Sequence, residues 1–156
     1  MAVVLPLAAA CGSGGGDGAA IIARAQDGLR HLGSTPVHVK VSVQGPIPIE
    51  RSFDVSAVQL SRLELTRWVK KPRRISCSDG LECARADVDV AAALSALGPR
   101  LPSLPIRAGD IRNAQIDCAV DNNGRTRYLH LRGDVHAGLG SMPFEADLDI
   151  PPSRRA

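Results

Sequence analysis

The feature that most constrains this chain is a strict alternation of apolar and polar side chains in two separate segments. Residues 37–43 read VHVKVSV, and residues 144–150 read FEADLDI. Because successive side chains of a strand point to opposite faces, each segment predicts a strand with one buried face. Such faces need an apolar cover, so the chain is constrained to an antiparallel sheet packed against another layer.

Two helices are predicted from apolar spacing and from candidate N-cap residues. Residues 19–32 carry apolar side chains at helical spacing, and Asp17 is the candidate N-cap. Gly28 weakens this helix by about 1 kcal/mol relative to alanine, so tertiary packing must hold it. Asp89 is the candidate N-cap of a short helix over residues 90–97.

Further strands are predicted over residues 53–66, 75–77, 81–90, 112–120 and 126–139. Residues 79–80 (DG) and 121–124 (DNNG) are typical of tight hairpin turns. The long segment 53–66 is interpreted as one strand with a bulge. The predicted fold class is therefore α+β: a curved antiparallel sheet, or half-barrel, of six or seven strands packed on an N-terminal helix and one short inserted helix.

Composition limits what the protein can do. Aromatic residues make up only 3% of the chain, so valine, leucine, isoleucine and alanine must build the core. Small side chains leave either a thin core or room for a ligand between the layers. A net charge of +3 is too low for a protein whose whole surface binds nucleic acid, and we expect no nucleic-acid partner.

The N-terminal segment indicates export. Residues 1–10 (MAVVLPLAAA) are apolar and uncharged but too short to span a bilayer, which needs about 20 residues. Small residues immediately before Cys11 resemble a lipobox, in which the cysteine is acylated after cleavage, for example with palmitate. We expect residues 1–10 to be a remnant signal peptide whose true start lies upstream, and residues 11–18 a glycine-rich tether. A single β-rich domain over residues 19–150 and a tail over residues 151–156 follow.

The predicted location is the extracytoplasmic face of the cell membrane, with the protein anchored through acyl chains on Cys11. A cytosolic protein that binds nucleic acid through its basic cluster is the alternative if Cys11 is never acylated. Salt-dependent retention on DNA would favour that alternative.

Residues 32–45 (LGSTPVHVKVSVQG), together with Cys11, the tether and the first helix, resemble the start of LprG/LppX-type mycobacterial lipoproteins. The resemblance covers about 35 residues. It implies a LolA-like half-barrel that encloses an apolar cavity for acylated lipids and acts as a carrier without catalysis. The amphipathic C-terminal strands also resemble tubular lipid-binding and AsmA-like envelope proteins.

The cysteines predict a disulfide between Cys77 and Cys83, which flank the turn at residues 79–80. A two-residue loop would place the two sulfurs on opposite faces, whereas a three-residue loop over residues 79–81 places Cys77 opposite Cys83. Sequence alone leaves a pairing with Cys118 open. The cysteine spacing does not favour a metal site, and we expect no metal or cofactor.

One polar strand face could suggest acid–base chemistry. Tyr128, His130, Arg132, Asp134 and His136 share this face, but no serine or cysteine nucleophile is tied to it by a recognisable motif. An outward row of this kind is typical of a solvated sheet surface. We expect no enzymatic activity.

The chain contains one basic cluster, over residues 67–74. It is interpreted as a loop that rests on anionic lipid headgroups, with the tryptophan at the interface. The residues predicted to contact the membrane surface are Arg67, Trp68, Lys70, Lys71, Arg73 and Arg74.

These features predict a monomeric, membrane-tethered lipoprotein that binds or carries a lipid or other apolar ligand between the sheet and the N-terminal helix. The residues predicted to face the ligand are Val39, Val41, Leu129, Leu131, Phe144 and Leu148. The alternative is an envelope interaction module without a small-molecule ligand, which uses an edge strand or the basic loop to bind a protein.

Overall fold

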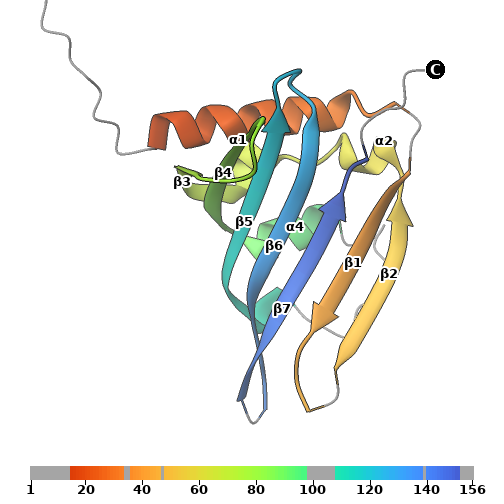
Figure 1. The fold of residues 1–156 in the computed structure, drawn as a ribbon. Helices are drawn as coiled ribbons and strands as arrows, with labels where there is room; N and C mark the ends of the chain where they lie inside the picture. The colour runs from red at the N-terminus through yellow and green to blue at the C-terminus, as the bar shows by residue number, and fades with distance from the viewer. Residues whose placement is uncertain (1–14, 34–35, 47, 98–107, 139, 152–156) are drawn as a thin grey trace, which may run out of the picture.

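The computed structural model describes residues 15–33, 36–46, 48–97, 108–138 and 140–151. They form one seven-stranded antiparallel sheet, shown in Figure 1. Across the sheet the order is β2 (Ile49–Val55), β1 (Val37–Val43), β7 (Gly140–Asp149), β6 (Thr126–Ala137), β5 (Ile111–Asp121), β4 (Leu81–Val88) and β3 (Val69–Ile75).

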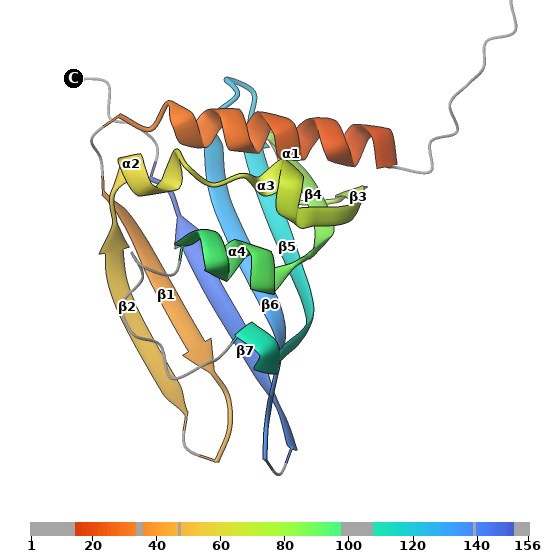
Figure 2. The same ribbon diagram turned by 180° about the vertical axis from the view of Figure 1, so that it is seen from behind.

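Helices cover one face of this sheet. Helix α1 (Gly15–Arg30) crosses the strands at one end of the sheet, and the short helices α2 (Ala57–Leu60), α3 (Leu65–Trp68) and α4 (Val90–Leu97) lie over the same face, as Figure 2 shows. A 3₁₀ turn at Ala108–Asp110 precedes β5. The curved sheet with an N-terminal helix confirms the predicted fold class, with seven strands and more short helices than expected.

Helix α1 begins at Gly15, so the end of the predicted tether is helical. Asp17 is therefore not the N-cap, contrary to the prediction. It lies in the first turn of α1, where its negative charge stabilises the positive end of the helix dipole. Residues 1–14, including Cys11, lie outside the described residues.

Close packing of α1 on the sheet explains the glycine at position 28. A side chain at Gly28 would collide with the hydroxyl of Thr126, at the start of β6. That buried hydroxyl donates a hydrogen bond to the carbonyl oxygen of Ala25 at 2.6 Å. The glycine therefore costs helix propensity but permits this contact between α1 and the sheet.

The prediction of one long strand over residues 53–66 is wrong. Strand β2 ends at Val55, and Ser56 then caps helix α2 through a reciprocal capping box with Gln59. The alternation of apolar and polar residues is interrupted between Leu60 and Leu63 because a turn follows this helix, not because of a bulge. Both leucines are buried.

The basic cluster is not a loop, which corrects a second prediction. Residues 69–75 form β3 at the edge of the sheet, paired with β4. The pairing is irregular between Lys70 and Arg73, and Lys71 has a positive φ of 51°. A bulge, a proline at position 72 and several charges are typical of an edge strand protected from further pairing.

The predicted disulfide between Cys77 and Cys83 is confirmed, with the two Cα atoms 6.1 Å apart. The predicted register is wrong, because Cys83 pairs with Ile75 and Cys77 lies two residues beyond the end of β3. The bond therefore runs diagonally across the hairpin.

Cys118 is a free, buried thiol. It packs in the core beneath the helices, whereas its neighbour Asp117 belongs to the opposite, polar face of the sheet. Burial raises the pKa of the Cys118 thiol to about 12, so this side chain acts as an inert apolar group.

Candidate functional site: an apolar cavity under the short helices

The buried side chains form two clusters rather than one. The larger cluster joins α1, α2 and α3 to β4, β5 and β6 and includes Leu60, Trp68 and Leu129. The smaller cluster lies on β1, β6 and β7 and includes Val41 and Phe144.

A cavity of about 270 Å³ lies where the two clusters meet, between the sheet and the short helices. Its walls contain residues of β1, β2, β3, β4, β5, β6 and β7 as well as α2, α3 and α4. In the part of the chain that the structure describes, eighteen of the twenty lining residues are apolar. The volume exceeds that of the dry cavity of about 150 Å³ that accepts benzene, and it is close to the lower limit of about 300 Å³ for small-molecule sites.

All six residues predicted to face a ligand line this cavity: Val39, Val41, Leu129, Leu131, Phe144 and Leu148. Alternation along β1, β6 and β7 places them on the covered face. The predicted cover is wrong, however. Among the described lining residues none comes from α1, which packs instead against β3, β4, β5 and β6.

Trp68 belongs to the cavity wall and not to the protein surface. Its side chain is only 6% exposed, so its predicted role at a membrane interface is wrong. Helix α3 turns this residue inward, where its large ring supplies core volume that the aromatic-poor strands lack. The sequence signal was the spacing of Leu65 and Trp68, three residues apart, as on one face of a helix.

The cationic side chains of the basic cluster lie on α3 and on the edge strand β3, and none of them lines the cavity. Arg67 pairs with Glu64 at 3.2 Å, and Arg74 lies 3.7 Å from Glu82. Lys70, Lys71 and Arg74 are exposed, and Arg73 is half-buried. Their contact with a membrane stays a prediction.

Among the described lining residues two are polar, and the side chains of both have other partners. The Asp54 carboxylate lies 3.0 Å from Nδ1 of His38, on the outer side of the sheet edge. The Gln59 side chain closes the capping box of α2. The remaining wall offers dispersion and hydrophobic contact, which suits binding of an apolar group rather than proton transfer.

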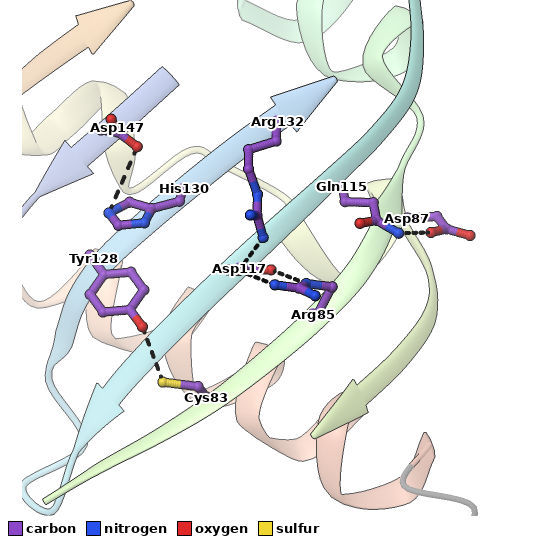
Figure 3. Close-up of polar contacts among 9 residues, drawn as sticks. All are labelled: Cys83, Arg85, Asp87, Gln115, Asp117, Tyr128, His130, Arg132 and Asp147. Carbon is purple, nitrogen blue, oxygen red and sulfur yellow. Dashed lines mark hydrogen bonds and ion pairs between the residues drawn. The ribbon is translucent and has the colours of Figure 1, made fainter. Parts of the chain in front are cut away.

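The other face of the sheet carries a polar network, drawn in Figure 3. Asp117 on β5 accepts two hydrogen bonds from Arg85 on β4, at 2.7 and 2.9 Å. It also accepts one from Arg132 on β6 at 2.7 Å. This carboxylate therefore ties three adjacent strands together.

The arginines govern the ionisation of this network. Burial alone would raise the pKa of Asp117, but hydrogen bonding to Arg85 and the positive charges of Arg132 and Arg85 outweigh it and lower that pKa below its ordinary value of 3.8. Asp117 is therefore an anion at neutral pH.

Tyr128 and His130 complete the polar face. Their rings stack with centroids 4.3 Å apart, and His130 lies 3.8 Å from Asp147. Burial, and to a smaller extent the Asp117 carboxylate, raise the pKa of Tyr128. Its hydroxyl lies 3.3 Å from the sulfur of Cys83, which has no proton because it is in the disulfide, so Tyr128 is the donor. The network stabilises the sheet and presents no activated nucleophile among the described residues.

Comparison with known proteins gives no family for the chain: no family model, curated protein or solved structure matches it. Among the described residues, no helix is both long and apolar enough to cross a membrane. The same part of the chain contains no group of three or more side chains arranged to hold a metal ion.

Proposed function

We propose that the protein binds a small apolar ligand, or one acyl chain of a lipid, in the cavity between the sheet and the short helices. The observation that carries the proposal is an apolar wall of eighteen residues around about 270 Å³ of space in a chain whose core is poor in large side chains. Filling such a space with a ligand removes apolar surface from water at about 25 cal/mol per Å².

The sequence also indicates where in the cell the protein acts. We propose that acyl chains on Cys11 hold the protein at the extracytoplasmic face of the cell membrane, where lipids are available as ligands. Labelling cells with a radioactive or clickable fatty acid tests the anchor. The wild-type protein should take up label, the Cys11→Ala variant should not, and label in both would contradict the assignment.

Trp68 supplies the assay for ligand binding. It is the single tryptophan of the chain and it lines the cavity, so its emission reports directly on the site. Titration with decanol, a neutral single-chain probe, should shift or quench this emission in a saturable manner. Emission that stays constant up to the solubility limit of decanol would refute the proposed function.

A further inference from the structure

The edge strand β2 places a cation beside the apolar cavity. Alternation along β2 puts Arg51 on the same face as Phe53 and Val55, which line the cavity. Arg51 also pairs across the strands with Val41, another lining residue. Its side chain is exposed, and no ion pair joins it to another described residue.

The neighbouring charged side chains alternate with Arg51 along β2 and pair with residues of β1 on the opposite face of the sheet edge, although Asp54 also contributes to the cavity wall. Glu50 pairs with Lys40 at 3.2 Å, and Asp54 pairs with His38 at 3.0 Å. These two carboxylates are therefore already engaged and do not neutralise Arg51. A cation at the margin of an apolar cavity is the arrangement that recognises a molecule with one apolar end and one anionic end.

We propose that the ligand is a single-chain amphiphile with an anionic head group, whose chain fills the cavity and whose head group pairs with Arg51. This inference rests on the proposed function. The cavity favours a ligand with one chain, because its volume of about 270 Å³ is close to the lower limit of about 300 Å³ for small-molecule sites. Arginine suits the role because its planar guanidinium matches the geometry of a carboxylate or phosphate.

The test compares decanoate with decanol, using the emission of Trp68 at low ionic strength and below micelle concentrations. In the Arg51→Gln variant decanoate should bind about tenfold more weakly, as expected for loss of a charge-assisted hydrogen bond. Decanol affinity should stay within about twofold of the wild type, because the apolar contacts are unchanged. Arg51→Lys should lose less affinity for decanoate than Arg51→Gln, because it keeps the charge but not the planar guanidinium, and added salt should weaken decanoate binding only.

Lys40→Gln is the matched control, because it removes one positive charge from the same sheet edge but on the opposite face. An equal loss of decanoate affinity in Lys40→Gln and Arg51→Gln would overturn the assignment, because the effect would then be a general one of net charge. Unchanged decanoate affinity in Arg51→Gln would also overturn it. If that variant then self-associates, Arg51 is an edge charge that prevents strand pairing.

The outcomes separate this inference from the proposed function. If decanol binds to the wild type but decanoate binding does not depend on Arg51, only the head-group assignment fails. If neither probe changes the emission of Trp68, both proposals fail. Thermal unfolding of each variant confirms that it is folded before its affinity is interpreted.

Discussion

Filling the cavity should stabilise the protein and weaken ligand binding at the same time. Ala146 on β7 lines the cavity and is 7% exposed, so Ala146→Leu directs three added carbon groups into the space. The added groups therefore reduce a space of about 270 Å³. At about 0.8 kcal/mol per buried methylene the gain in unfolding free energy is at most about 2.4 kcal/mol, and cavity-filling substitutions commonly yield about 0.5–2 kcal/mol.

The same three groups displace the ligand. Loss of room for three methylenes of the ligand corresponds to about 2.4 kcal/mol, or about 50-fold weaker binding of decanol. Urea unfolding followed by Trp68 emission measures the stability, and decanol titration measures the affinity. Ala23→Leu, on the exposed face of α1, is the matched control and should change neither quantity by a measurable amount. Lower stability of Ala146→Leu with unchanged decanol affinity would refute the reasoning, because overpacking without displacement means that the space is not a ligand site.

Three further predictions follow from the fold. Opening the Cys77–Cys83 disulfide by Cys77→Ser should lower the unfolding free energy by about 2 kcal/mol, the chain-entropy value for a sequence separation of 6, and equal urea midpoints for oxidised and mutant protein would contradict this. Ser56→Ala should cost about 1 kcal/mol through loss of the capping box of α2, measured by urea unfolding against Ser52→Ala on the exposed face of β2 as control. The lowered pKa of Asp117 means that its stabilising contribution is complete above its unfolded pKa of 3.8 and is lost as pH falls through the lower folded value. Asp117→Asn should therefore destabilise the protein at pH 6 by about 1–3 kcal/mol and flatten the stability profile below pH 4, whereas an unchanged acid limb would exclude this carboxylate as its source.

The parts of the fold that could be predicted are those fixed by a local pattern. Strict alternation placed β1 and the buried face of β7, and Asp89 marked the start of α4, whose bounds at residues 90–97 are as predicted. The Asp89 side chain accepts a hydrogen bond from the backbone of Ala92, as a cap should. Residues of the covered face followed from the same alternation, which is why six cavity-lining positions could be named.

The largest errors in assigning helices and strands lie between residues 56 and 75, where two patterns compete. Apolar spacing there is compatible with a strand, but the pair Ser56 and Gln59 favours a helix start, and the local hydrogen bonds decide the outcome. The spacing of Leu65 and Trp68 places both on one face of a helix, but the burial of that face depends on how α3 packs against strands distant in sequence. The charges that surround Trp68 in sequence made it look exposed, whereas most of them lie on the edge strand β3 and Trp68 lies in the cavity wall.

The sequence predicts that a cavity exists but not where it lies. A core poor in aromatic residues predicts unfilled space, but the position of that space depends on which helices cover the sheet. Helix α1 packs over β3–β6 and leaves the region above β1 and β7 to the short helices. Sequence therefore predicted one wall of the site correctly and the opposite wall incorrectly.

The central claim is that the cavity holds an apolar ligand, and native mass spectrometry of the protein purified gently from the cells that produce it tests it most directly. The account predicts a population heavier than the delipidated chain by the mass of one single-chain molecule, which organic extraction removes and which the Ala146→Leu variant carries at much lower occupancy. A single unliganded mass in both proteins, together with a Trp68 emission that does not respond to decanol, would contradict it.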